Sequence, residues 1–318
     1  MKRAPPRGIA AAPEYNRPMD DMDFTKPQPP AGAPATPTPF KAASSPFYNP
    51  AMAERLFRSA GRAETFGVGQ PLFVEDQKTP GGLFSRRAAN RMYYLAAGEV
   101  QLSIAGRALD TLRAGEVVGE MAVITGEPRT ATATAKTACT AWSLGLEELQ
   151  AALAKEPEFA MMVMSVMFDR LRFATARLAA RRIPFAPRPG EAPTFDAAQV
   201  AALAAALPRS AIVRFTAGAS VMREGQTGAC MYVVKSGQVA IGVREQLVEV
   251  VNAGGTFGEM ALVDQSPRSA GAQAHVESEL LAIDRGAFLK AVAGHPAFAM
   301  AMMRSVAGRL KHITAQLP

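Results

Sequence analysis

Apolar and polar residues alternate in short runs along one part of the chain, and broader apolar faces follow them. Residues 231–251, MYVVKSGQVAIGVREQLVEVV, are β-branched runs broken by Ser-Gly and Arg-Glu, a pattern typical of strands joined by tight turns. Residues 92–112 repeat this pattern with Ala-Gly at both turns. Residues 137–144 and 278–284 predict further strands, so each region is expected to begin as a set of short strands.

Two helices are predicted after the last strand. Residues 285–294 favour one helix, with Asp284 as its N-cap and Gly294 as its stop. Pro296 occupies a favoured first helical position, and a second helix is predicted from there to residue 317. Strands followed by helices indicate an α+β domain, and many short strands in a small domain favour a closed roll or jelly roll.

Methionines form a stripe on the predicted long helices. This stripe is interpreted as core or as a helix-pairing face rather than a cofactor site. Its members are Met161, Met162, Met164, Met167, Met300, Met302 and Met303.

An internal repeat organises most of the chain. With an offset of 139 residues, 92–178 aligns with 231–317 without a gap. Upstream, residues 72–77 resemble 221–226 at an offset of 149, so the first repeat carries about ten extra residues within 78–91. The repeat predicts two domains of one kind.

Four segments are therefore expected. Residues 1–49 are rich in proline and have no helical or strand period, which predicts a disordered arm. The two domains are placed at 50–184 and 195–318. A short, rather stiff, proline-rich linker is expected at 185–194.

Composition narrows the class of protein only slightly. Hydrophobic residues make up 48% of the 318 residues, and the net charge of +7 is compatible with an anionic ligand or with an arginine-rich surface. No apolar run reaches the roughly 18 residues of a membrane span, and no signal peptide is recognisable. The only two cysteines, Cys139 and Cys230, lie in different repeats, so a cytoplasmic location is expected.

One segment occurs twice and carries the candidate chemistry. We call VGEMAVITGEPRTA (118–131) the first cassette and FGEMALVDQSPRSA (257–270) the second cassette. Each has a glutamate and, nine residues later, an arginine among apolar neighbours, where an isolated charge would be costly to bury. Either the two charges of a cassette pair with each other, or they bind a ligand that has both a hydroxyl group and a negative charge.

The neighbouring residues favour a ligand. Residues 259–263 predict a single helical turn, whose first N–H groups would be unpaired and would face an anion. Gly258 lets the backbone approach closely, and Arg268 matches two phosphodiester oxygens by bidentate hydrogen bonding. Glu259 remains as an acceptor for a sugar hydroxyl. The pattern indicates a pocket for a sugar phosphate.

These cassettes resemble the phosphate-binding cassette of cyclic nucleotide-binding domains, which occur in catabolite activator proteins, kinase regulatory subunits and gated channels. The resemblance covers both repeats. It implies two tandem eight-stranded β-rolls, each flanked by helices and ending in a lid helix. It also implies that Glu120 and Glu259 hold a ribose 2′-hydroxyl, and that Arg129 and Arg268 pair with a cyclic phosphate.

The resemblance and the residues together define the candidate binding site. The predicted ligand-binding residues are Gly119, Glu120, Met121, Ala122, Arg129, Thr130 and Ala131 in the first cassette, and Gly258, Glu259, Met260, Ala261, Arg268, Ser269 and Ala270 in the second. Thr175 and Thr314 occupy matching places on the long helices; one alternative is that one or both face the base, but they are expected to be ordinary helix residues and are left out of the site.

The residue after the cassette arginine bears on the nucleotide. In the family, a threonine there, as at Thr130, resembles the cGMP-dependent kinase pattern, and a serine, as at Ser269, resembles the catabolite activators. A hydroxyl contact contributes only about 0.5–1.5 kcal/mol. We therefore expect cAMP as the first ligand, cGMP as the second and a cyclic dinucleotide as a remote third, with no other cofactor and no metal.

Two functions remain open at this stage. One is a regulatory protein that passes nucleotide binding to an unknown effector protein, and the other is an interaction scaffold made of two ligand-free rolls. No helix-turn-helix follows the second set of helices, so direct DNA binding is not expected, and a DNA-binding partner subunit is the weakest option. No catalytic constellation is recognisable, so enzyme activity is not expected. Paired lid helices would allow a homodimer.

Overall fold

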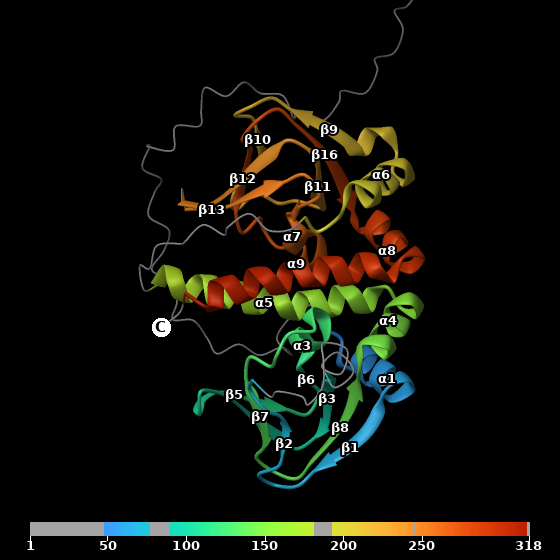
Figure 1. The fold of residues 1–318 in the computed structure, drawn as a ribbon, viewed down its shortest axis with the longest axis vertical. Helices are drawn as coiled ribbons and strands as arrows, with labels where there is room; N and C mark the ends of the chain where they lie inside the picture. The colour runs from blue at the N-terminus through green and yellow to red at the C-terminus, as the bar shows by residue number, and fades with distance from the viewer. Residues whose placement is uncertain (1–47, 77–89, 181–192, 245, 317–318) are drawn as a thin grey trace, which may run out of the picture. The chain divides into compact units, whose positions relative to one another are not determined.

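The computed structural model describes residues 48–76, 90–180, 193–244 and 246–316 (Figure 1). The predicted arm lies outside these residues except for Tyr48 and Asn49. Tyr48 is buried, and the Asn49 side chain accepts a hydrogen bond from Met52 N, so the described fold includes the last two residues of that segment. Most of the extra loop (78–91) and of the linker (185–194) also falls outside the described residues, and the domain boundaries stay predictions.

The first repeat forms two four-stranded antiparallel sheets with the orders β1-β8-β3-β6 and β2-β7-β4-β5. Its strands are β1 (Arg62–Phe66), β2 (Pro71–Phe73), β3 (Met92–Ala97), β4 (Glu99–Ile104), β5 (Arg107–Arg113), β6 (Val117–Val118), β7 (Thr132–Ala135) and β8 (Cys139–Leu144). Its helices are α1 (Pro50–Ala60), α3 (Glu120–Thr125), α4 (Leu146–Lys155) and α5 (Glu158–Ala180).

The second repeat has the corresponding sheets, β14-β11-β16-β9 and β10-β15-β12-β13. Its strands are β9 (Ile212–Phe215), β10 (Ser220–Met222), β11 (Cys230–Ser236), β12 (Gln238–Val243), β13 (Gln246–Asn252), β14 (Thr256–Phe257), β15 (Gly271–Ala274) and β16 (Ser278–Asp284). Its helices are α6 (Ala197–Ala206), α7 (Glu259–Asp264), α8 (Arg285–Gly294) and α9 (Pro296–Thr314), with a 3₁₀ turn at Arg209–Ala211.

Both repeats confirm the predicted eight-stranded roll with flanking helices. The register is also repeated: Met92 faces Leu144 between β3 and β8, and Met231 faces Ile283 between β11 and β16, each pair shifted by 139. Each roll closes around its own apolar interior, which includes Val100 in the first and Val239 in the second, both with no exposed surface.

The helix signals of the second repeat are confirmed, with one change at each C-terminus. Asp284 caps α8 by accepting a hydrogen bond from Ala287 N, 2.8 Å away. Gly294 is the last residue of α8 rather than its stop, because the cap is His295, whose N–H donates to Ala291 O at 2.9 Å. The α9 helix begins at Pro296 as predicted and ends at Thr314, three residues before the predicted end.

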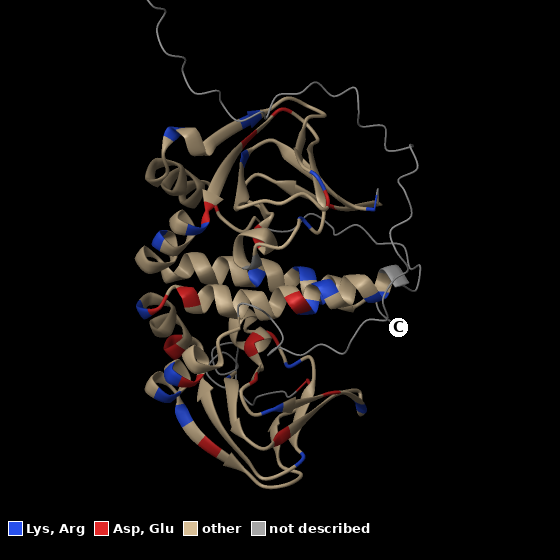
Figure 2. Ribbon diagram, turned by 180° about the vertical axis from the view of Figure 1, so that it is seen from behind, with Lys and Arg blue, Asp and Glu red and all other residues tan. Residues whose placement is uncertain are grey.

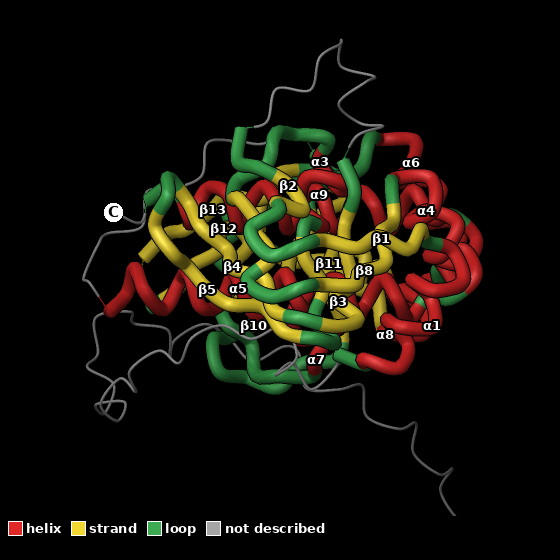
Figure 3. The backbone as a smooth tube through the Cα atoms, turned by 90° about the horizontal axis from the view of Figure 1, so that it is seen from below, coloured by secondary structure: helices red, strands yellow, loops and turns green. Residues whose placement is uncertain are grey.

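The long helices α5 and α9 run side by side between the two rolls (Figure 1). Figure 3 shows the same fold from below, with the helices in red and the strands in yellow. Every member of the methionine stripe is at most 2% exposed and belongs to one apolar cluster that draws residues from both repeats. The stripe is therefore core and helix-pairing surface, as predicted. No helix within the described ranges is both long enough and apolar enough to span a bilayer.

Two glycines at the same repeat position provide a test of packing. Gly115 and Gly254 both have positive φ, 94° and 81°, where an L-residue costs about 1–2 kcal/mol. A Cβ at Gly115 would meet nothing within 4 Å, but at Gly254 it would lie 2.1 Å from Phe195 O. We expect Gly254→Ala to lower the free energy of unfolding by about 2–4 kcal/mol and Gly115→Ala by about 1–2 kcal/mol, because only Gly254→Ala adds overpacking. Urea unfolding measures both, and equal losses would contradict this packing.

Candidate functional site

The helix of each cassette is preceded by a glycine that no other residue can replace without rearrangement. Gly119 and Gly258 precede α3 and α7 and have φ of 84° and 79°, in the left-handed region. A Cβ at Gly119 would lie 2.8 Å from Nη1 of Arg129, and at Gly258 it would lie 2.7 Å from Nη1 of Arg268. The glycine therefore serves both the turn and the close approach of the cassette arginine.

The cassette arginines are buried and are held by backbone carbonyls. Arg129 donates to Gly119 O (3.0 Å) and Arg91 O (2.7 Å). Arg268 is only 5% exposed and makes the equivalent bonds to Gly258 O (2.8 Å) and Cys230 O (2.7 Å). A guanidinium has five N–H donors, so these two bonds fix its position and leave further donors available.

Aromatic rings and a further glycine complete the surroundings of the cassette arginines. The guanidinium of Arg129 lies 4.2 Å from the ring centroid of Phe73, and that of Arg268 lies 5.9 Å from that of Tyr232. Both are cation–π contacts. Burial lowers the pKa of Arg129, although Tyr93 and Glu120 act in the opposite direction. A Cβ at Gly228 would lie 2.4 Å from Nε of Arg268, so this position keeps room for the guanidinium.

The cassette glutamates pair with arginines of the long helices, not with the cassette arginines. Arg170 of α5 binds Oε1 of Glu120, which is 1% exposed. Nη1 of Arg309 on α9 lies 2.9 Å from Oε1 of Glu259, which also accepts from the hydroxyl of Thr256 at 2.6 Å. Glutamate and arginine within one cassette are thus held separately, by different partners.

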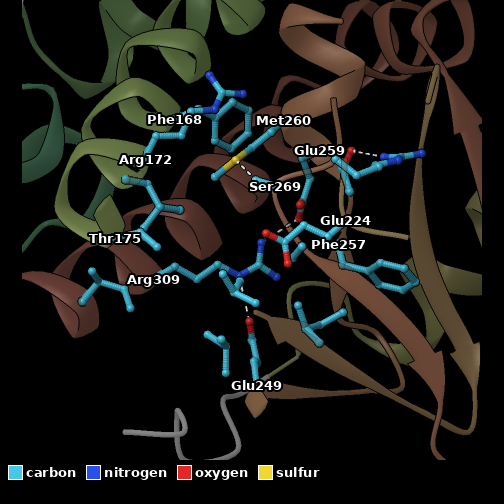
Figure 4. Close-up of a pocket in the computed structure, with 18 of the residues that line it drawn as sticks. Phe168, Arg172, Thr175, Glu224, Glu249, Phe257, Glu259, Met260, Ser269 and Arg309 are labelled. Atoms are coloured by element: carbon cyan, nitrogen blue, oxygen red, sulfur yellow. Dashed lines mark hydrogen bonds and ion pairs between the residues drawn. The ribbon is translucent and has the colours of Figure 1, made fainter. Parts of the chain in front are cut away.

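Arg309 sits between two carboxylates (Figure 4). Besides Glu259, it contacts Glu249 Oε2 at 3.1 Å and donates to Thr256 O. Burial alone would lower the pKa of Arg309, but the adjacent Glu259 and Glu249 outweigh burial and raise it. The charge of Arg309 is therefore fully engaged inside the protein.

The first repeat is less completely paired. Val117 stands where the second repeat has Thr256, and the side chain of Asp110, at the position of Glu249, accepts from Thr111 N. Oε2 of Glu120 is buried and has no hydrogen-bond partner within the described residues. A buried acceptor without a donor costs about 1–3 kcal/mol, so this oxygen is suited to a ligand hydroxyl.

A cavity of about 300 Å³ opens at the second cassette (Figure 4). All seven predicted residues of that cassette line it: Gly258, Glu259, Met260, Ala261, Arg268, Ser269 and Ala270. Strands β12 and β13 supply an apolar wall that includes Ile241 and Val248, and α9 supplies Arg309 and Ile313.

Helix α5 of the first repeat forms the remaining wall of this cavity, which was not predicted. Phe168, Arg172 and Thr175 line it from α5 (Figure 4). Thr175, which was expected to be an ordinary helix residue, lies on α5 and also lines this cavity, because the side-by-side packing of α5 and α9 brings it over the second cassette.

The structure brings the predicted residues of the first cassette together in the same backbone arrangement. Glu120, Ala122 and Arg129 are buried, Met121 and Ala131 are half-buried, and Thr130 is exposed. Arg129 and Gly119 make the same hydrogen bond as Arg268 and Gly258. The binding roles of these residues stay predictions.

Arg170 and Arg309 were missed as members of the site. A signal was present, because an arginine recurs at the 139-residue offset on two helices that each carry a methionine stripe. Such a residue needs a buried partner of opposite charge, and the cassette glutamates were the available candidates.

Comparison with known proteins finds the same domain twice. The sequence profile of the cyclic nucleotide-binding domain matches residues 83–156 and 212–295. A CRP-like cAMP-activated global transcriptional regulator of Mycobacterium tuberculosis is 30% identical over 128 residues, 39% of this chain and 57% of that protein. A cAMP-dependent protein kinase regulatory subunit of Colletotrichum orbiculare is 27% identical over 186 residues, 58% of this chain and 42% of that protein.

Among solved structures, the catabolite activator protein of Thermus thermophilus is 25% identical, with a TM-score of 0.35, over 42% of this chain and 60% of that one. The chain spans about half the length of the two curated relatives, 57% and 42%. The two profile matches fall one in each repeat and each includes a cassette. The chain therefore belongs to the cyclic nucleotide-binding domain family and carries two such domains in tandem.

Proposed function

We propose that the second repeat binds a cyclic nucleotide, cAMP in preference to cGMP, and that the chain acts as a nucleotide-responsive regulator. The observation that carries this proposal is the pair of buried, opposite charges in one cavity. Glu259 and Arg268 both line the 300 Å³ cavity, but they do not pair with each other. Arg268 is held by carbonyl groups, and Glu259 is held by Arg309. An acceptor and a cation separated in this way suit a ribose hydroxyl and a phosphodiester.

The phosphate is assigned to Arg268. Its known partners are neutral carbonyls, so within the described residues no carboxylate offsets its charge. A guanidinium in that state attracts an anion strongly, because burial weakens its solvation. Ser269, whose hydroxyl donates to Met260 Sδ at 3.1 Å, and the first residues of α7 line the same cavity. The backbone N–H groups at the start of α7 are further donors.

The ribose is assigned to the glutamate. Thr256 and Arg309 both reach Oε1 of Glu259, and neither reaches Oε2. An ionised carboxylate accepts about four hydrogen bonds, so capacity for a hydroxyl remains. In the first repeat, the unpartnered Oε2 of Glu120 supports binding of the same kind of ligand there.

The base is assigned to the wall formed by the strands and helices. Ile241, Val248 and Ile313 provide apolar surface for a planar ring, and Thr175 adds a hydroxyl group from the first repeat. Apolar walls with a few polar groups are the usual lining of small-molecule sites. A purine fits this lining.

The regulatory role is proposed by analogy with the relatives. One is named as a cAMP-activated transcriptional regulator and the other as a kinase regulatory subunit. We propose that this chain likewise works in the cytoplasm, is not itself an enzyme and passes a ligand-dependent shift of its long helices to a separate effector protein.

A ligand-free scaffold is the second candidate. The observation in its favour is that Glu259 already has an arginine partner, so that carboxylate is stable without a ligand. Calorimetric titration separates the two functions: no heat from either nucleotide at millimolar concentration would favour the scaffold.

We expect Arg268→Ala to abolish one of two binding events for cAMP. The loss of the guanidinium leaves phosphate charge uncompensated, at a cost of roughly 3–5 kcal/mol if that charge is buried. Isothermal titration calorimetry measures the effect. Arg214→Ala is the matched control, because Arg214 is 81% exposed and pairs with Glu279 away from the cavity. Unchanged stoichiometry and affinity in Arg268→Ala would refute the assignment.

A ligand analogue tests the glutamates without altering the protein. 2′-Deoxy-cAMP should bind roughly 10–150-fold more weakly than cAMP, because a hydrogen bond to a charged group contributes about 1.5–3 kcal/mol. Competition against a fluorescent cyclic nucleotide gives the ratio for each site. Equal affinity of the two ligands would show that the glutamates do not hold the 2′-hydroxyl.

A further inference from the structure

Two side-chain contacts that cross between the repeats are related to each other by the repeat itself. Nη2 of Arg172, on α5, donates to Oγ of Ser266 in the second cassette at 2.8 Å. Nζ of Lys311, on α9, donates to Oε2 of Glu127 in the first cassette at 2.7 Å. An offset of 139 converts Arg172 into Lys311 and Glu127 into Ser266. One contact is thus made twice, in opposite directions.

Arg172 and Lys311 each lie two positions after an arginine that binds a cassette glutamate. Arg170 of α5 binds Glu120, and Arg309 of α9 binds Glu259. Side chains two positions apart on an α-helix point about 200° apart. Each long helix therefore reaches its own cassette from one side and the opposite cassette from the other. Figure 2 shows charged positions gathered in the C-terminal halves of the paired helices.

An apolar cluster underlies these contacts and has the same symmetry. Met121 and Met260, which follow the two cassette glutamates, pack against it. The cluster itself is drawn from both long helices and consists of Leu171, Ala174, Leu178, Leu310 and Ile313. Both cassette helices thus rest on one shared surface, and Arg304 of α9 adds a hydrogen bond to Ile124 O at 3.1 Å.

We propose that Arg172 and Lys311 are positioning residues that couple the two nucleotide sites, each by tying a long helix to the cassette of the opposite repeat. The proposal rests on the proposed function for the identity of the ligand, but the two contacts between the repeats are present in the protein without a ligand.

The route of coupling is continuous in both directions. Ser266 lies two residues before Arg268, and Arg172 both binds Ser266 and lines the cavity. A ligand that fixes this part of the second cassette therefore fixes α5, and with it the Arg170–Glu120 pair of the first site.

The reverse route runs from Glu127 through Lys311 and α9 to the Arg309–Glu259 pair. Energetic coupling between two binding sites is reciprocal, so each ligand changes the affinity of the other site by the same factor.

The test compares the whole protein with its single-site variants. Arg129→Ala leaves the second site and Arg268→Ala leaves the first, with the lysine variants as substitutes if either alanine variant fails to fold. In calorimetric titration with cAMP, we expect at least one wild-type binding constant to differ about fivefold or more from its single-site value. A wild-type isotherm equal to the sum of the two single-site isotherms would overturn the proposal.

The double substitution Glu127→Ala/Ser266→Ala removes both acceptors and keeps Arg172 and Lys311. We expect it to reduce the fivefold difference to less than about twofold. Glu54→Ala is the matched control, because the Glu54 and Glu127 side chains are both 47% exposed in ion pairs, and it should keep the full difference. If the double variant also kept the fivefold difference in binding constant, Arg172 and Lys311 would have no part in the coupling.

A measurement without ligand separates this proposal from the proposed function. In Glu127→Ala, amide hydrogen exchange of residues 259–270 should be at least about threefold faster than in the wild type, although the substitution lies in the first repeat. Faster exchange without nucleotide binding would refute the function and retain the coupling. Nucleotide binding with additive isotherms and unchanged hydrogen exchange would support the proposed function and refute the coupling.

Discussion

A carboxylate buried at the start of each cassette helix is the constraint on which the rest of the structure depends. Glu120 and Glu259 are 1% and 3% exposed, and an ionised group at that depth requires a cation close by. The cassette arginine does not provide this cation, because backbone carbonyl groups hold it away from the glutamate. The cation comes instead from the long helix that follows the roll, so that helix must return across the cassette, in the position where its apolar face also packs.

The two repeats meet this constraint to different degrees. The second surrounds Glu259 with Thr256 and Arg309, and Arg309 has a second carboxylate in Glu249. The first offers Glu120 only Arg170 and leaves Oε2 without a donor within the described residues. A ligand hydroxyl would therefore relieve a larger deficit in the first repeat, whereas the second site is stable before anything binds.

The sequence predicted what is local and what is repeated. Strand-turn patterns, the Asp284 cap and the 139-residue offset define the two rolls, and the Gly-Glu step predicts the cassette helix. Partners distant in the chain were not predictable in this way: Arg170 lies 50 residues from Glu120, and Lys311 lies 184 residues from Glu127. No local sequence pattern identifies contacts between residues so far apart in the chain. The wall that α5 gives to the second cavity likewise depends on how the two repeats pack.

The contrast between the two arginines of the second cavity explains how one pocket can hold both charges of a ligand. Arg309 faces Glu259 and Glu249, so its charge is offset within the protein and its elevated pKa reports that attraction. Within the described part of the chain, the groups that hold Arg268 are two carbonyl oxygens and the face of Tyr232, which orient a guanidinium without neutralising it. An entering anion therefore gains most at Arg268, while Arg309 holds Glu259 in position to accept a hydroxyl. The separation of these tasks between two arginines is what allows an acidic and a basic group to remain in the same small cavity without collapsing onto each other.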